Sequence, residues 1–527
     1  MKAIDLYSGA GGWSLGLRMA GIEVIRSYEW WDCAARTHRA NLGSRVDEVD
    51  IRQLDPRNVP EADIVVGSPP CTEFSFANRG GNGDIAEGLR DIAKFLEIVE
   101  HLQPAYWAME NVPRVAGILR REIQPGGLLR RYADLVDVIE VVNMASLGLP
   151  QKRRRMIAGR YPLELLEAYT ERLPNRTFGG VLERLSDAPV RDPIYDLKLT
   201  REELTEQEPE APLNDEEERM NREAKTYHPV YNKMSFPDEL ERPSRTVTAV
   251  CTRVSRESIV IEAPERPGCY RRLTLRERAS LQGFPITYQF FGGAYTDKLK
   301  LIGNALPPLA AYYIGHAMLG TEPGDLGASG SILCDHSQPP DRPDETPPPG
   351  LSNRHRRNRK FRAALPHLRF GSGMRVELAN SARKDNPSWR TAFYYGNSKK
   401  YETVELTDEL LATALDALPS DTSNEVRKAI TDRHDSWSAH SGADIQRRWT
   451  HRAEESVHPF ELADDLGATA KSIRAIINVV SLDQILDIIF ELVPNVRDGQ
   501  RPKFRDHGHW IMAGLIVGAA FNASRAE

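Results

Sequence analysis

The sequence predicts an α/β fold in which helices cover a parallel sheet. Over residues 1–160, short apolar runs alternate with amphipathic segments, and such a repetition of strand, helix and strand is typical of this fold. A glycine-rich turn follows the first apolar run, and polar residues follow several later runs. Because ligands bind at the carboxyl ends of parallel strands, these residues mark the expected site.

The individual elements follow from the local pattern. Residues 3–7 form a short strand, and residues 14–20 form a helix that ends near Gly21. Further strands are expected at 22–28, 62–67 and 105–111, with a helix at 93–102.

The later part of the chain is less regular. The acidic run 201–225 is expected to be a solvated helix or a mobile segment, and 243–262 is rich in β-formers. Residues 322–353 are rich in Pro, Gly, Ser and Asp and indicate a linker. The basic run 354–362 continues it, either as a solvated linker or as a phosphate-contacting arm.

Beyond the linker, two segments stand out. The spacing of small and apolar residues over 461–474 resembles a helix-turn-helix, although any corner between two helices would show it too. Residues 482–493 are apolar at helical spacing and are expected in a core.

Composition limits the classes of protein. The 527 residues carry a net charge of −6, 40% of them are hydrophobic, and the length suggests about three domains. Five cysteines without a CxxC pair disfavour a disulfide scaffold and a zinc site, so we expect no metal. The start lacks a secretion signal and residues 511–521 are too short to span a bilayer, which predicts a cytoplasmic protein without membrane contact.

The glycine turn at 5–12 (DLYSGAGG) lies between a strand and a helix. Glycines allow a tight turn and close approach of a ligand, but the spacing is not that of a dinucleotide fingerprint. Glu29 ends the next strand and is suited to ribose hydroxyls, and Trp30 beside it is suited to a purine. Asp50 and Ile51 end the following unit, where an acid can accept from an adenine amino group. The arrangement predicts a cofactor that contains a nucleoside.

Three further elements carry reactive groups. Cys71 follows two prolines after a strand, in a loop that suits a nucleophile better than an inert core cysteine. Glu110 also follows a strand, where a carboxylate between apolar residues needs a partner or a proton. Arg153 and Arg155 alternate on one face of an extended segment.

Taken together, these elements resemble one family, the DNA cytosine-5 methyltransferases, over about residues 1–320. Thr72 departs from the family's usual Gln after the nucleophile, and Tyr7 from its usual Phe. The matching elements, in order, are the glycine turn 5–12, Glu29-Trp30, Asp50-Ile51, Pro69-Pro70-Cys71, Glu110-Asn111-Val112, Gln151 with Arg153 and Arg155, Arg242-Pro243-Ser244-Arg245-Thr246, residues 276–285 and residues 303–308.

The resemblance implies a Rossmann-like S-adenosylmethionine-dependent methyltransferase fold with a small target-recognition domain and a C-terminal extension. It implies that Cys71 adds to C6 of a flipped cytosine, that Glu110 binds N3 and the exocyclic amine, and that Arg153 and Arg155 lie at the pyrimidine O2 and a phosphate. The cofactor residues it implies are Tyr7, Ser8, Gly9, Gly11, Gly12, Glu29, Trp30, Asp50, Ile51, Pro70, Asn304 and Ala305.

Candidate contacts with DNA are Arg245, Thr246, Arg253 and Arg256. Target reading is expected from 160–195 and 226–241, with the acidic run facing away from DNA and with Tyr227, His228, Tyr231, Asn232 and Lys233 as candidates.

The expected domains are catalytic (1–160 plus 298–321), target-recognition (161–297), linker (322–364) and C-terminal accessory (365–527). We expect a monomer that acts on double-stranded DNA at the nucleoid, with a cognate restriction endonuclease as a possible partner. The alternatives are a transfer-RNA cytosine methyltransferase, an inactive DNA-binding regulator, and an enzyme that transfers a group other than methyl.

Overall fold

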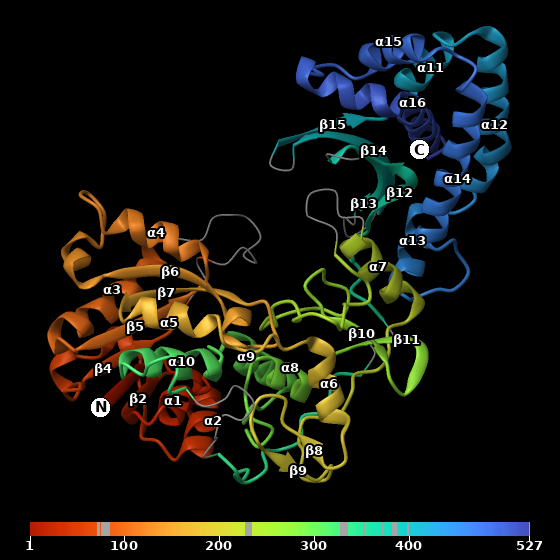
Figure 1. Cartoon of the computed structure of the whole chain (residues 1–527). Coiled ribbons are helices and arrows are strands. Elements are labelled where there is room, and N and C mark those ends of the chain that lie inside the picture. The colour runs from red at the N-terminus through yellow and green to blue at the C-terminus, as the bar shows by residue number, and fades with distance from the viewer. Residues whose placement is uncertain are drawn as a thin grey trace. The chain divides into compact units, whose positions relative to one another are not determined.

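A seven-stranded sheet organises the first of two structural units. The computed structural model describes residues 1–70, 74, 85–226, 234–326, 336–350, 354–370, 373–381, 387–397 and 400–525. The first unit covers 1–225 and 234–350. Its sheet has the order β3-β2-β1-β4-β5-β7-β6 (Figure 1). The strands are β1 (Lys2–Leu6), β2 (Glu23–Glu29), β3 (Val46–Glu48), β4 (Ile64–Gly67), β5 (Tyr106–Asn111), β6 (Val138–Asn143) and β7 (Arg154–Arg160).

The sheet is mixed, whereas the sequence predicted a parallel one. Strands β3, β2, β1, β4 and β5 pair in parallel, as predicted, but β7 pairs antiparallel with both β5 and β6. The last two strands are joined by a short connection rather than by a crossover helix, which permits the antiparallel pairing. The α/β class is confirmed.

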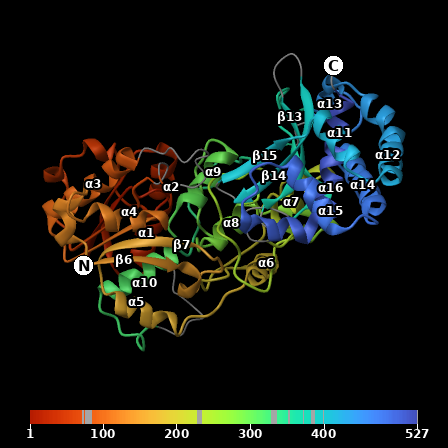
Figure 2. The same ribbon diagram turned by 90° about the horizontal axis from the view of Figure 1, so that it is seen from above.

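Alternating side chains bury both faces of the sheet. Ile64 and Val66 face one hydrophobic cluster, and Val65 faces the other, as the two-residue period of a strand requires. Helices α1 (Gly12–Met19), α5 (Leu163–Thr170) and α10 (Pro308–Met318) contribute to the first cluster, and α3 (Ile85–Leu102) and α4 (Arg114–Glu122) to the second. Figure 2 shows these elements from above.

Residues 303–308 return to the glycine turn, as the sequence predicted. A Cβ on Gly12 would lie 2.1 Å from the carbonyl oxygen of Leu306, so the missing side chain permits the approach. Helix α10 then packs against α1, where a Cβ on Gly16 would lie 2.2 Å from the carbonyl oxygen of Pro308. The two ends of the catalytic region are therefore joined at the turn.

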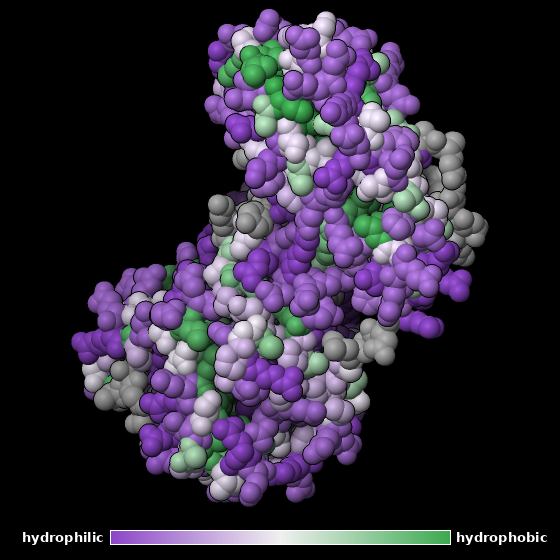
Figure 3. Space-filling view, turned by 90° about the vertical axis from the view of Figure 1, so that its right-hand side faces the viewer, coloured by the Kyte–Doolittle hydropathy of each residue, from purple (hydrophilic) through white to green (hydrophobic). Residues whose placement is uncertain are grey.

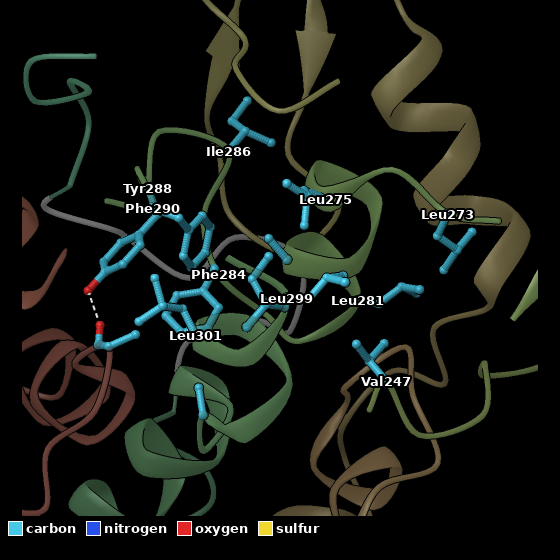
Figure 4. Close-up of a cluster of buried hydrophobic side chains, with 14 of the residues drawn as sticks. Val247, Leu273, Leu275, Leu281, Phe284, Ile286, Tyr288, Phe290, Leu299 and Leu301 are labelled. Atoms are coloured by element: carbon cyan, nitrogen blue, oxygen red, sulfur yellow. Dashed lines mark hydrogen bonds between the residues drawn. The ribbon is translucent and has the colours of Figure 1, made fainter. Parts of the chain in front are cut away.

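A third hydrophobic cluster is built mainly from the segment between β7 and α10. Phe284, Tyr288 and Phe290 form its aromatic centre, and the Tyr288 hydroxyl donates to the carbonyl oxygen of Ala10 at 2.5 Å (Figure 4). This bond ties the cluster to the glycine turn. Elements of this segment are α6 (Phe178–Ser186), β8 (Val190–Arg191), β9 (Lys198–Leu199), α7 (Asp215–Thr226), β10 (Val260–Ala263), β11 (Arg266–Arg272), α8 (Leu275–Leu281) and α9 (Tyr295–Asn304), with α2 (Asp32–Leu42) packing alongside.

Three local expectations for this unit need correction. Residues 246–250 form no strand, because the polar groups of the Val247 backbone bond to the side chains of Gln151 and Arg153. The acidic run 201–225 is not uniformly solvated, because Glu210 is buried and paired with Arg272. The expected linker also packs in part, since His336 is buried against Thr287.

The second unit includes residues 351–527, apart from those outside the described ranges. Four antiparallel strands form a sheet in the order β12-β13-β14-β15. They are β12 (Arg362–Arg369), β13 (Arg375–Ser381), β14 (Ser388–Asn397) and β15 (Lys400–Glu405). The helices are α11 (Asp408–Asp416), α12 (Ser420–Ser438), α13 (Gly442–Trp449), α14 (Pro459–Ile477), α15 (Leu482–Leu492) and α16 (Arg501–Ala523).

The helix-turn-helix interpretation of 461–474 is wrong, because these residues lie within the single continuous helix α14. Gly467 does not make a turn: a Cβ there would lie 2.8 Å from the ring of Pro366, so glycine permits close packing of α14 on β12. The prediction of a core helix at 482–493 is confirmed by α15, which buries Ile485 and Ile489.

The surface in view in Figure 3 is mainly hydrophilic, with hydrophobic residues in small patches. Among the described residues, no helix is both long enough and apolar enough to cross a membrane.

Replacing Gly16 by alanine tests the contact between α1 and α10. We expect Gly16→Ala to lower the free energy of unfolding by about 1–3 kcal/mol, because the added methyl overlaps Pro308 and Ala311. Gly117→Ala in α4 is the matched control: no atom lies within 4 Å of its added Cβ, so this change should stabilise by about 0.5–1 kcal/mol. Urea denaturation measures both, and equal effects would contradict the tight packing.

Candidate cofactor and cytosine site

The glycine turn between β1 and α1 has a backbone that few residues adopt. Tyr7, Gly9 and Gly11 have φ values of 55°, 54° and 86°, in the left-handed region. A Cβ on Gly11 would lie 3.0 Å from the Tyr288 hydroxyl oxygen, whereas one on Gly9 would meet no atom within 4 Å. The turn is therefore packed on one side and borders open space on the other. Ser8 is buried beneath it, with its Oγ 3.1 Å from Nδ1 of His38.

Glu29 closes the turn from the end of β2. Its Oε2 accepts from the Gly9 N–H at 2.8 Å, and its Oε1 accepts from the N–H groups of Trp30 and Trp31 at 2.9 and 2.8 Å. Burial raises the pKa of Glu29, and these three backbone bonds oppose the rise. A carboxylate offers about four acceptor positions, so roughly one remains for a further donor such as a ribose hydroxyl.

The neighbouring residues complete a surface suited to a nucleoside. Trp30 exposes 71% of its surface directly after Glu29, which is unusual for an indole. Asp50 is exposed after β3 and caps the short helix Ile51–Gln53 by accepting from the Arg52 N–H at 3.0 Å, while Ile51 is buried. These residues fit S-adenosylmethionine, because they combine a carboxylate, an exposed aromatic ring and a glycine turn at one sheet edge.

The sequence did not reveal a network around Tyr7. The Tyr7 hydroxyl donates to the Asp91 carboxylate of α3 at 3.3 Å, and Arg52 donates twice to the same carboxylate, at 2.8 and 2.6 Å. This network joins the glycine turn, the loop beside Asp50 and α3. The Tyr7 hydroxyl, the departure from the family pattern, is the group that makes the connection.

The loop after β4 is anchored as far as the described residues extend. The Trp13 indole N–H donates to Ser68 Oγ at 3.1 Å, and the Asn111 side-chain amide donates to the carbonyl oxygen of Pro69 at 3.1 Å. Pro70 is exposed. The predicted nucleophile Cys71 and its neighbour Thr72 lie outside the described residues.

Glu110 and Arg155 form an ion pair beside this loop. Glu110 pairs with Ile157 across β5 and β7, so Arg155, two residues before Ile157, is its diagonal neighbour on the same face. The Arg155 Nε lies 2.9 Å from Glu110 Oε1, with Glu110 buried and Arg155 half-buried. The partner that a carboxylate in this position requires is thus Arg155.

Arg153 has a different role from the predicted one. Its side chain is fully buried (0% exposed) and donates to the carbonyl oxygens of Val247, Gly303 and Ala305 at 3.1, 3.0 and 3.0 Å. A guanidinium in this position cannot contact a substrate, so we correct the expected pyrimidine contact to a structural one. Asn304, between two of these carbonyls, is exposed.

The predicted DNA-contacting arginines also have internal partners. Arg245 donates to the Asp238 carboxylate and to the carbonyl oxygens of Arg256 and Ser258. Arg253 donates to the Glu217 carboxylate at 2.7 and 2.8 Å. These internal bonds stabilise the folded segment and occupy the guanidinium groups of Arg245 and Arg253, which argues against their assignment as phosphate contacts.

The other predicted DNA-contacting residues are Thr246 and Arg256. Thr246 donates to the carbonyl oxygen of Lys152, and Arg256 is half-buried. The other predicted recognition residues, Tyr227, His228, Tyr231, Asn232 and Lys233, lie outside the described residues.

Three features of the site were missed by sequence reasoning: the network around Tyr7, the Asn111 anchor, and a buried pair of amides. Gln151 Nε2 donates to Gln282 Oε1 at 2.8 Å, and Gln282 Nε2 donates to the carbonyl oxygen of Ile302 at 2.7 Å. The local pattern around Gln151 indicates a motif but not a partner 131 residues away.

The fold and this edge of the sheet are those of a methyltransferase that uses S-adenosylmethionine. The family model for C-5 cytosine-specific DNA methylase matches residues 1–320, and the chain belongs to this family. It is accordingly a DNA (cytosine-5) methyltransferase. Residues beyond 320 lie outside the family match.

Individual relatives agree with the family. The type II methyltransferase M.FnuDI of Fusobacterium nucleatum is 26% identical over 336 residues, covering 60% of this chain and 93% of the relative. The type II methyltransferase M.AplI of Arthrospira platensis is 30% identical over 331 residues, covering 60% and 85%. Among solved structures, the Dnmt2 methyltransferase of S. pombe has a TM-score of 0.42 and 15% identity, covering 61% of this chain and 98% of that one.

The buried carboxyl group of Asp5, on β1 below the turn, should make the stability of the protein depend on pH. Its side chain is fully buried, Ser14 Oγ donates to its Oδ2 at 2.7 Å, and burial raises its pKa to about 7. A raised pKa stabilises the fold while the group is protonated, and this contribution is lost as the pH rises from about 4 towards 7 and above. The Asp5→Asn variant lacks this titration. From about pH 4 to about pH 7, the free energy of unfolding of the variant should therefore fall less than that of the wild type.

Asp55→Asn is the control for Asp5→Asn. Arg57 lowers the pKa of Asp55 to about 2, so the titration of Asp55 lies below this range and the control should follow the wild type. Denaturation curves at a series of pH values compare the three proteins. Parallel curves for Asp5→Asn and the wild type would contradict the raised pKa.

Proposed function

We propose that this methyltransferase acts on duplex DNA by flipping a cytosine out of the helix and forming a covalent adduct between Cys71 and its C6. One observation carries the proposal: Glu110 is paired with Arg155 at 2.9 Å, and the adjacent Asn111 holds the carbonyl of Pro69, two residues before Cys71. The carboxylate and the loop that leads to the thiol are thereby linked through consecutive residues of β5.

The proposed chemistry overcomes the weak nucleophilicity of C5. The Cys71 thiolate forms a bond to C6, and the electron pair of the C5–C6 double bond becomes available at C5. Glu110 holds a proton at N3 and accepts from the exocyclic amine, which stabilises the adduct, and Arg155 orients Glu110 and lies towards O2. S-adenosylmethionine, when bound, would supply an electrophilic methyl group for C5 and keep the electron pair of the broken S–C bond as a neutral thioether. Transfer of the C5 proton to water then restores the double bond, and Cys71 leaves as the thiolate.

A cytosine within a duplex cannot present C6 to a thiol, so the base must leave the stack. Unstacking costs a few kcal/mol, which contacts in the pocket and with phosphates offset. Thr246 and Arg256 remain candidates for these contacts, since their segment continues from the backbone held by Gln151 and Arg153. The segment 161–297 is the proposed target-recognition region.

Methyl transfer to duplex DNA and to transfer RNA, measured side by side with labelled S-adenosylmethionine, tests the substrate. We expect label in cytosine-containing duplex DNA only, and bisulfite sequencing should locate 5-methylcytosine at a defined sequence. Label in RNA alone would replace the proposal by the transfer-RNA activity, and transfer to neither would favour an inactive binding protein.

Replacing Cys71 by serine tests the covalent route. We expect Cys71→Ser to lower kcat by at least about a thousandfold, because a hydroxyl is a much weaker nucleophile than a thiolate. Cys269→Ser is the matched control, since Cys269 is free and lies in β11, outside the seven-stranded sheet that carries the site. Calorimetric titration should show unchanged binding of S-adenosylmethionine to both variants. A fully active Cys71→Ser enzyme would exclude the adduct.

A further inference from the structure

Basic and acidic residues are concentrated in different parts of the sequence of the second unit. Residues 354–400 contain thirteen Lys and Arg but only two Asp and Glu, whereas residues 401–527 contain thirteen Lys and Arg and twenty-one Asp and Glu. The basic part supplies β12, β13, β14 and the first residue of β15, and the acidic part supplies the rest of β15 and the helices α11 to α16. Such segregation places positive charge on the sheet.

Strand register gathers arginines on one face of this sheet. Arg362 pairs with Ala379, which pairs with Arg390, so these three share a face. Arg375, four residues from Ala379 along β13, lies on the same face. The opposite face carries buried apolar residues that pack against α14 and α16, as Figure 1 shows for the helices beside β12 and β14. They include Leu365, Val376, Leu378 and Phe393.

An aromatic pair orients two of these arginines. The guanidinium carbons of Arg362 and Arg375 lie 4.9 and 4.7 Å from the ring centre of Tyr394, and both side chains pair with Glu377. One carboxylate thus serves two cations. Tyr401, 53% exposed, packs edge-on against Tyr394 with ring centres 5.7 Å apart. Arg375 is itself buried with Glu377 and positions Tyr394, whereas Arg362 and Arg390 are exposed. The face therefore presents two cations beside an exposed aromatic ring.

The basic segment before β12 is held in place rather than being a loose linker. The Arg359 guanidinium lies 3.6 Å from the ring centre of Trp449 in α13 and donates to the Trp449 carbonyl oxygen at 2.9 Å. Gln446 of the same helix donates to the carbonyl oxygens of Arg357 and Arg359 at 2.9 and 3.1 Å. With the backbone fixed, the exposed side chains of Arg356, Arg357 and Lys360 project from a defined position.

We propose that residues 354–360 and the arginine-bearing face of the β12–β15 sheet form a second DNA-binding surface, which holds the phosphate backbone of a duplex. Its positive charge complements a polyanion, and fixed arginines lose less freedom on binding phosphate than mobile ones. The small residues between the arginines, Ala364, Ala379 and Ala392, let a backbone approach the strands closely. The choice of duplex DNA as the polyanion rests on the proposed function; the surface itself does not.

The test uses the full chain and a duplex of A·T pairs alone, which contains no cytosine to be methylated. Arg356→Ala/Arg357→Ala/Lys360→Ala should weaken binding about tenfold or more at low salt and reduce the slope of log affinity against log salt by about 2–3. Arg390→Ala should reduce the slope by about one. Fluorescence anisotropy across a salt series measures both.

The matched control removes three exposed lysines from the helices, as Lys428→Ala/Lys471→Ala/Lys503→Ala. It should leave the slope close to that of the wild type, and all variants should keep the thermal stability of the wild type. A basic-segment variant that behaves like this control would overturn the proposal, and so would a loss of binding confined to single-stranded RNA. Methylation of cytosine-containing DNA by the wild type is scored separately, so failure of the proposed function is distinguished from failure of this surface.

Discussion

The buried guanidinium of Arg153 is the contact on which the catalytic unit depends. It joins carbonyl oxygens from residues 247, 303 and 305, about 90 to 150 positions away in the chain. Removing a guanidinium from water costs several kcal/mol, so the arrangement is stable only when good acceptors surround it. Three carbonyls meet this condition, and the same bonds bring the segment 303–308 back to the glycine turn. The cofactor edge and the segment 303–308 are therefore parts of one folded core.

Neighbouring arginines serve different purposes because they differ in depth and partners. Arg153 faces carbonyl oxygens in the core, whereas Arg155, two residues later, reaches the Glu110 carboxylate at the sheet edge. Arg245 and Arg253 fold the segment between β7 and α10 through carboxylates. In the second unit, Arg362 and Arg390 lie exposed on one face of the β12–β15 sheet. An arginine of this chain can therefore be assigned to DNA binding only when its partners within the protein are known.

Much of the catalytic unit could be predicted because its signals are local. The early strands, the glycine turn, Glu29 and the exposed Trp30 follow from short patterns and from the rule that ligands meet parallel strands at their carboxyl ends. The antiparallel direction of β7 and the absence of a strand at 246–250 could not be predicted, because strand pairing depends on segments that are distant in the sequence. Gly467 was misinterpreted for a similar reason: its role is to admit Pro366, and no local pattern shows that neighbour.

By itself the sequence determined the α/β class, the family, and the order of chemical groups along the chain, since these depend on residue type and spacing. Only the tertiary structure decided that Glu110 pairs with Arg155 rather than with Arg153, and that Tyr7 reaches Asp91. It alone also placed the arginines of β12, β13 and β14 together on one face. The physical reason is common to all three: the direction of a side chain and its partner are set by strand register and packing between segments far apart in the chain.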